Sequence, residues 1–103
     1  MQRILKYKLQ DRAMTLEDRS LAVAMMPKSA KIISCGAQGD DLYLWAEILV
    51  EQSADAEKDL SERKFDVLMT GPMYPVRPWT FIGTVQMQSG LVFHIYERHK
   101  LIL

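Results

Sequence analysis

Few side chains in this sequence could carry out covalent chemistry or bind a metal. The single cysteine is Cys35, and the two histidines are His94 and His99. A cysteine nucleophile needs a base within hydrogen-bond reach of its thiol, and a metal site needs at least three converging ligands. Free cysteines are usually buried and inert, so we favour a packing role for Cys35. His94 is then an outward strand residue, and His99 belongs to a charged tail.

The common sequence signatures of catalysis are absent. The chain contains no P-loop, no Gly-x-Ser-x-Gly elbow, no His-Glu-x-x-His and no Cys-x-x-Cys. We therefore expect neither an enzyme nor a resident metal or cofactor. A Cys35-dependent activity is kept only as a third alternative, after two kinds of binding function.

The strongest signal for binding is the segment GPMYPVRPW at residues 71–79. Its three prolines cannot donate to a β-ladder, so the segment is predicted to be an ordered irregular loop. The candidate binding residues, of types that dominate binding hot spots, are Met73, Tyr74, Arg77 and Trp79. The alternative is a rigid crossover in which Tyr74 and Trp79 only cover the end of the core.

A second candidate surface lies on a predicted strand over residues 42–50. Alternation places its aliphatic side chains on one face, and Tyr43, Trp45 and Glu47 on the other. If exposed, two aromatic rings beside a carboxylate would suit a partner or a stacked base. We favour the alternative, in which a second sheet or another subunit covers Tyr43 and Trp45. The pattern alone leaves open which face is wet.

A period of two dominates the apolar residues, which predicts strands rather than helices. We expect strands over residues 3–9, 21–26, 30–37, 42–50, 65–70, 79–88 and 91–97, with hairpin turns at 38–41 and at Ser89-Gly90. The fold class is therefore all-β, or β-dominated α+β: a small antiparallel sandwich or barrel of about six to seven strands. Much of its core is expected from Trp79, Phe81, Val85, Met87, Leu91, Phe93 and Ile95.

Two polar segments interrupt the strands of this single 103-residue domain. Residues 10–20 are expected to form a loop or one helical turn, and residues 51–64 a short exposed helix or a loop. Residues 98–103 are expected to be a short C-terminal tail.

Charge and composition narrow the function classes further. Thirteen basic residues balance thirteen acidic ones, which argues against a dedicated nucleic-acid binder and leaves a homo-oligomer open. Basic residues at both ends would form a local patch only if the first and last strands were neighbours. A lone cysteine suits a reducing cytoplasm, and the N-terminus has neither a signal-peptide nor a membrane-spanning pattern.

Five short sequence motifs follow one another along the chain. They are Ile4-Leu5-Lys6-Tyr7, Met26-Pro27-Lys28-Ser29-Ala30-Lys31-Ile32, Leu44-Trp45-Ala46, Thr70-Gly71, and a hairpin with Ile82, Gly83, Thr84, Gln86, Gly90, Leu91, Val92, His94 and Glu97. In this order the chain resembles a family of short bacteriophage and prophage proteins of no established activity. It departs at Ser29, where glycine is common, in the insert at 51–64, and after Glu97.

The resemblance implies a viral origin and expression in the cytoplasm of a bacterial host, and no catalytic role transfers to any residue. We expect an accessory protein that binds a host macromolecule, such as a defence or metabolic component. The first alternative is an oligomer that traps a nucleotide-type small ligand, and a further alternative is a minor virion component.

Overall fold

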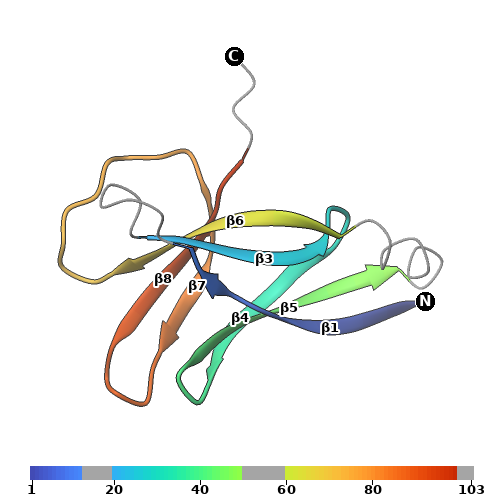
Figure 1. The fold of residues 1–103 in the computed structure, drawn as a ribbon, viewed down its shortest axis with the longest axis horizontal. Helices are drawn as coiled ribbons and strands as arrows, with labels where there is room; N and C mark the ends of the chain where they lie inside the picture. The colour runs from blue at the N-terminus through green and yellow to red at the C-terminus, as the bar shows by residue number, and fades with distance from the viewer. Residues whose placement is uncertain (13–19, 50–59, 100–103) are drawn as a thin grey trace.

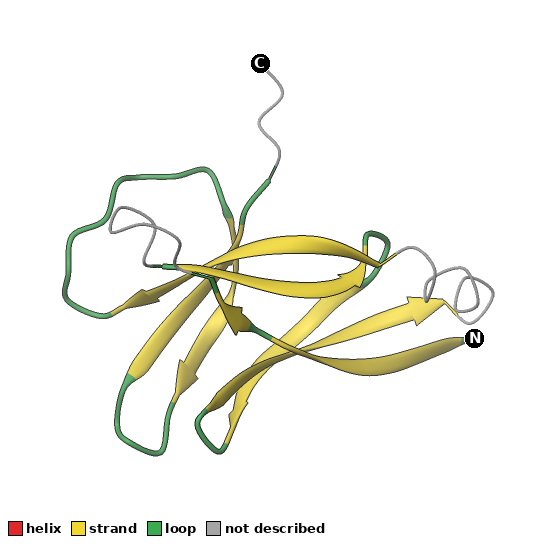
Figure 2. Cartoon of the chain, in the orientation of Figure 1, coloured by secondary structure: helices red, strands yellow, loops and turns green. Residues whose placement is uncertain are grey.

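The structure is a computed structural model that describes residues 1–12, 20–49 and 60–99. Within those ranges it contains strands and no helix (Figure 2). The strands are β1 (Gln2–Lys8), β2 (Gln10–Asp11), β3 (Leu21–Pro27), β4 (Lys31–Gln38), β5 (Asp41–Leu49), β6 (Leu60–Met69), β7 (Thr80–Gln86) and β8 (Val92–Glu97). The predicted all-β fold is confirmed, and no helix long and apolar enough to cross a membrane occurs in the described residues.

The strands form two antiparallel sheets (Figure 1). One has the order β1-β5-β4, and the other has the order β2-β3-β6-β8-β7. The first extended segment of the chain belongs to both, because β1 pairs with β5 while β2 pairs with β3. Between them, the Leu9 N–H donates to the Leu42 carbonyl at 2.9 Å, which holds the point where the chain changes sheets. Such crossing strands join the sheets of a sandwich at its corners.

The core lies between the inner faces of the two sheets. Leu44 of β5 and Ile95 of β8 are fully buried there, together with Phe65 of β6. Because strand side chains alternate, Leu44, Ala46 and Ile48 share the inner face, so Tyr43, Trp45 and Glu47 point outward. The structure thus decides which face of this strand is wet. Val50, which alternation places on the same face as Leu44, lies outside the described residues.

The predicted core is confirmed at four of its seven residues and wrong at the other three, Trp79, Phe81 and Leu91. Val85, Met87, Phe93 and Ile95 do belong to the core cluster or pack against it. Phe81, however, is 54% exposed, because a register shift between Phe81 and Gly83 turns it to the outer face beside Tyr96. A bulge of this kind reverses the inside–outside alternation. Leu91 is 47% exposed beside the turn, and Trp79 lies half-buried before β7 begins.

Of the two predicted hairpin turns, one is confirmed and the other is longer than predicted. The turn between β4 and β5 has the expected glycine, and Gly39 adopts a φ of 61°. The turn between β7 and β8 is longer than the expected Ser89-Gly90 pair. Gly90 N–H donates to the Met87 carbonyl at 3.0 Å, Met87 N–H donates to the Leu91 carbonyl at 2.8 Å, and Gly90 has a φ of 92°. These bonds define a loop over 88–90 that ends in a left-handed glycine.

The polar segments contain more strand than their composition predicts. Residues 10 and 11 form β2, and β6 begins at Leu60, inside the insert expected over 51–64. Alternation continues through the charged residues of β6, where Arg63 turns inward and binds Glu97 through Nε at 2.7 Å. Residues 13–19 and 51–59 lie outside the described ranges. The two basic ends of the chain are not neighbours, because β1 and β8 belong to different sheets.

Candidate functional site

The Pro-rich loop (residues 70–79) joins β6 to β7 and packs over the outer face of the five-stranded sheet. Figure 1 shows it as the wide orange turn at the end of the molecule opposite the N-terminus. Beneath it lies Asp66 of β6. Phe65 points into the core, so its neighbour Asp66 points outward, yet Asp66 is only 1% exposed. A carboxylate buried this deeply requires charged or hydrogen-bonding partners.

Asp66 receives donors from three separate parts of the chain. Its Oδ1 accepts a hydrogen bond from Arg98 Nε at 2.9 Å and one from Ser20 Oγ at 3.2 Å. Its Oδ2 accepts a hydrogen bond from Arg77 Nη1 at 3.0 Å. Bonds between guanidinium and carboxylate groups are among the strongest in proteins. The Asp66 carboxylate therefore ties the Pro-rich loop to the sheet and to the end of β8.

A second contact restrains the first half of the loop. The hydroxyl of Tyr74 accepts a hydrogen bond from the backbone N–H of Met69 at 3.1 Å. Val76 lies between the two anchors, Tyr74 and Arg77, and is 102% exposed. Met73 immediately precedes Tyr74 and is 98% exposed. The loop thus presents two apolar side chains to solvent from a backbone held at Tyr74 and Arg77. A restrained loop loses little conformational entropy when a partner binds.

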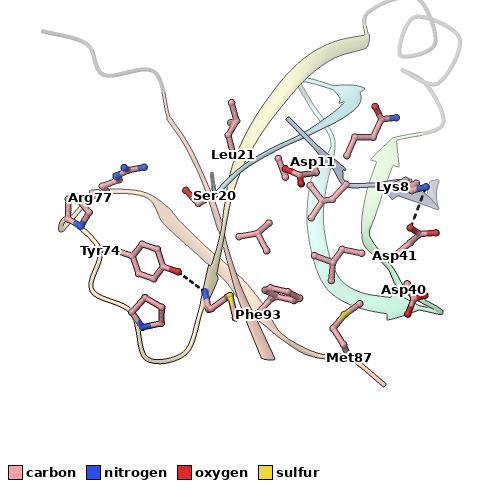
Figure 3. Close-up of a pocket in the computed structure, with 18 of the residues that line it drawn as sticks. Lys8, Asp11, Ser20, Leu21, Asp40, Asp41, Tyr74, Arg77, Met87 and Phe93 are labelled. Atoms are coloured by element: carbon pink, nitrogen blue, oxygen red, sulfur yellow. Dashed lines mark hydrogen bonds and ion pairs between the residues drawn. The ribbon is translucent and has the colours of Figure 1, made fainter. Parts of the chain in front are cut away.

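A cleft of about 970 Å³ opens beside the loop (Figure 3). Tyr74 and Arg77 lie along one side of it, and the ion pair between Lys8 Nζ and Asp41 Oδ1, 3.5 Å apart, lies along the other. Its floor is apolar and is formed by side chains of both sheets, including Leu42, Met87 and Phe93. The cleft and the exposed loop residues form one continuous candidate binding surface.

The six residues predicted to bind a partner fall into two groups. Met73, Tyr74, Arg77 and Trp79 all lie on the Pro-rich loop; the last three line a smaller pocket over the outer face of the five-stranded sheet, whereas Met73 lies beside the cleft. Tyr43 and Trp45 lie on the outer face of the three-stranded sheet. The two groups therefore lie on different sheets, and Tyr43 and Trp45 line neither the cleft nor this pocket.

Tyr43 and Trp45 are half-buried by their neighbours on the same sheet. Their ring centroids are 6.4 Å apart, and Lys6 Nζ lies 4.7 Å from the centroid of the Tyr43 ring. The Trp45 ring rests on Gly36, where an added Cβ would lie 3.2 Å from its nearest ring carbon. Lys6 also donates to Gln38 Oε1 at 2.7 Å, so the cation over Tyr43 is held in place. These contacts use much of the aromatic surface for local packing.

Cys35 and the histidines do not converge. Cys35 faces inward against Gly83, and burial raises the pKa of its thiol. His94 faces outward, with Nε2 at 2.8 Å from Thr70 Oγ1 and Nδ1 at 3.0 Å from Thr84 Oγ1. His99 contacts Trp79, with ring centroids 6.3 Å apart. Across residues 1–12, 20–49 and 60–99, no three metal-ligating side chains gather.

The sequence singled out Tyr74 and Arg77 but not Asp66, to which Arg77 is bound, or Arg98, the second arginine on Asp66. Asp66 interrupts an apolar run, and a charge there is a signal that some partner must compensate it. The partners themselves are distant, since Arg77 follows by 11 residues and Arg98 by 32. Arg98 was assigned to a tail, but its backbone N–H donates to the Lys64 carbonyl at 2.9 Å and its side chain reaches Asp66.

Comparisons with known proteins give one positive result. No curated protein and no solved structure matches the chain. One family model, described as "Domain of unknown function (DUF7352)", matches residues 1–102. Because that match covers nearly the whole chain, this protein is a member of the DUF7352 family.

Proposed function

We propose that this chain is a non-enzymatic accessory protein of bacteriophage origin that binds a macromolecule of the bacterial host through its Pro-rich loop. The target class that we propose is a component of host defence or metabolism, and the site of action is the host cytoplasm. The viral part of this proposal rests on the sequence resemblance described above. The binding part rests on the geometry of the loop.

One observation carries the binding proposal: the loop is fixed to the sheet and exposes apolar side chains. Arg77 is held by the buried Asp66, while Met73 and Val76 are exposed almost completely. A free soluble domain gains nothing from holding such side chains in water, whereas a partner could bury them without reordering the loop. The apolar floor of the adjoining cleft would extend the contact.

Affinity capture from a bacterial lysate tests this proposal. The wild-type chain is expected to retain a host protein that is lost with Tyr74→Ala and with Trp79→Ala. The variant Phe81→Ala is a matched control, because Phe81 is an exposed aromatic residue outside the loop. The proposal fails if nothing is retained, or if the Phe81 variant loses the host protein as completely as the loop variants do.

The volume of the cleft favours a second candidate function, the binding of a small nucleotide-type ligand. About 970 Å³ falls within the range of roughly 300–1,000 Å³ that small-molecule sites occupy. Tyr74 offers a ring for stacking, and Arg77 offers guanidinium donors for a phosphate. A panel of cyclic nucleotides at about 100 times the dissociation constant would stabilise the fold by about 2.7 kcal/mol. An unchanged melting temperature across the panel would rule this candidate out.

A further inference from the structure

The cleft beside the Pro-rich loop lies at an open end of the hydrophobic core. Met87 belongs to the buried core cluster, and Leu42, Val67 and Phe93 pack against that cluster from both sheets. The same four side chains line the cleft, where Leu42, Val67 and Phe93 are only partly buried. The described part of the chain therefore leaves some of its apolar interior uncovered between the turn from β4 to β5 and the Pro-rich loop (Figure 3).

The side chains that line this cleft suit an aromatic group. Met69 and Met87 bring two thioethers to it, and Tyr74 and Phe93 bring two rings. Methionine side chains adapt to the shape of what they contact, and their sulfur atoms pack favourably against aromatic rings. Pairs of aromatic rings attract one another by more than the area they bury. An aromatic side chain of a partner, which is a residue type that dominates binding hot spots, would make both kinds of contact here.

The charges around the cleft favour a neutral or cationic occupant over an anionic one. The charged side chains of the described residues that line it are Lys8, Asp11, Asp40, Asp41 and Arg77. Both cations already have a carboxylate partner, because Lys8 Nζ lies 3.5 Å from Asp41 Oδ1 and Arg77 Nη1 lies 3.0 Å from Asp66 Oδ2. Asp40, on the turn between β4 and β5, is exposed to solvent. A basic group of the partner would therefore be attracted to the Asp40 end of the cleft.

We infer that the cleft receives an aromatic side chain of the host protein, and that a basic residue next to this side chain lies against Asp40. The inference rests on the proposed protein-binding function and names the chemistry of the segment that is bound. Met73 lines the cleft as well, so the exposed side chains of the Pro-rich loop and the floor of the cleft would contact one continuous segment of the partner. A nucleotide would occupy the same cleft, so the two occupants are alternatives.

Titration of the whole chain with three short peptides tests this inference. Acetyl-Trp-Lys-amide carries both proposed groups, acetyl-Ala-Lys-amide lacks the ring, and acetyl-Trp-Glu-amide reverses the charge. Binding is followed in NMR spectra by the signals of isotope-labelled methionine methyl groups, which single Met→Leu substitutions assign. Met69 and Met87 line the cleft, whereas Met25 of β3 does not line it and serves as the internal control.

We expect acetyl-Trp-Lys-amide to move the Met69 and Met87 signals saturably, in the millimolar range that suits so small a ligand, while the Met25 signal stays in place. Acetyl-Ala-Lys-amide should cause no saturable shift. Acetyl-Trp-Glu-amide should bind about threefold more weakly, which is the size of effect that one exposed charge pair gives. Asp40→Asn should remove most of that difference, whereas Glu62→Gln, which changes an acidic residue outside the cleft, should leave it unchanged.

The absence of a saturable shift of Met69 and Met87 with acetyl-Trp-Lys-amide would overturn the inference. Equal binding of the alanine peptide would show that the ring is not recognised, and equal binding of the glutamate peptide would show that the charge is not; either result also overturns it. Saturation of the same methyl signals by a cyclic nucleotide but by none of the peptides would overturn it in favour of the second candidate function.

The outcome is separable from that of the lysate capture. If acetyl-Trp-Lys-amide binds in the cleft while no host protein is retained, the aromatic site exists and the proposed function fails. If a host protein is retained through the loop while the peptide causes no shift, the proposed function stands and the aromatic site in the cleft fails.

Discussion

At the scale of single residues, Asp66 determines where the Pro-rich loop lies. Its carboxylate is almost completely buried and holds Arg77, Arg98 and Ser20, which come from three separate parts of the chain. A buried ion pair of this kind adds little net stability over an apolar substitute, but removing one partner leaves the others uncompensated. Its importance is therefore in fixing the geometry of the loop.

We expect Asp66→Asn to lower the free energy of unfolding by about 3–5 kcal/mol, because the buried negative charge that both guanidinium groups contact is then removed. Urea denaturation measures this change. The matched control is Glu62→Gln, which breaks the exposed pair in which Arg12 Nη1 lies 3.0 Å from Glu62 Oε2. That change should cost no more than about 1 kcal/mol. Equal effects of the two substitutions would show that Asp66 is not the anchor.

The Cys35 thiol gives a second prediction at this scale. Burial raises its pKa above the ordinary value of 9.0, so the folded chain binds the thiol proton more tightly than the unfolded chain does. Stability from this group is therefore complete below pH 9.0 and is lost as the pH rises through the raised pKa. A titration of thiolate absorbance in the folded chain should show a midpoint above that of the same thiol in urea. A midpoint at or below the value in urea would contradict this account.

At the scale of elements, β4 and β7 meet where the edges of the two sheets approach each other. Cys35 of β4 faces Gly83 of β7 so closely that a Cβ on residue 83 would lie 2.6 Å from the sulfur. Position 83 requires glycine because any larger side chain would collide with the Cys35 sulfur. Gly83 also follows the bulge that turns Phe81 outward. The approach of the two sheet edges therefore depends on a small residue at this position.

Gly83→Ala is expected to destabilise the chain by about 1–3 kcal/mol through overpacking. The same substitution in a Cys35→Ala background should cost much less, because the atom that it meets is gone. A double-mutant cycle from urea denaturation measures the coupling between the two positions. Additive effects, with no coupling between positions 35 and 83, would show that the two sheet edges do not touch as described.

The element scale also shows how far the sequence alone could lead. Alternation divided the side chains of β5 between two faces, although only the structure shows which face is the inner one, and a glycine beside an aspartate located the turn at Gly39. Both signals are local. The bulge at Phe81 was missed because it depends on how β7 pairs with β8. Asp66 was missed as an anchor for the same reason, since Arg98 lies 32 residues further along the chain. Local patterns predicted the strands, whereas the site depends on contacts between distant residues.

At the scale of the whole molecule, the sandwich separates its two candidate surfaces. Tyr43 and Trp45 are packed among neighbours on the outer face of the three-stranded sheet, while the Pro-rich loop packs on the five-stranded sheet beside a cleft that both sheets line. Because the basic and acidic residues of the chain balance, we expect no long-range attraction for nucleic acid. Of the two surfaces, the loop therefore has the stronger claim to be the docking site.

The most direct test of this claim is to measure the dissociation constant of the complex between the captured host protein and each of two double variants of this chain. Met73→Ser with Val76→Ser removes the exposed apolar groups of the loop. Met25→Ser with Leu60→Ser removes a matched pair, 49% and 47% exposed, outside the loop. We predict that the loop variant binds at least about 30-fold more weakly, as the loss of a hot spot of about 2 kcal/mol requires, while the matched pair binds as the wild type does. Equal affinities for the loop variant and the wild type would contradict the account.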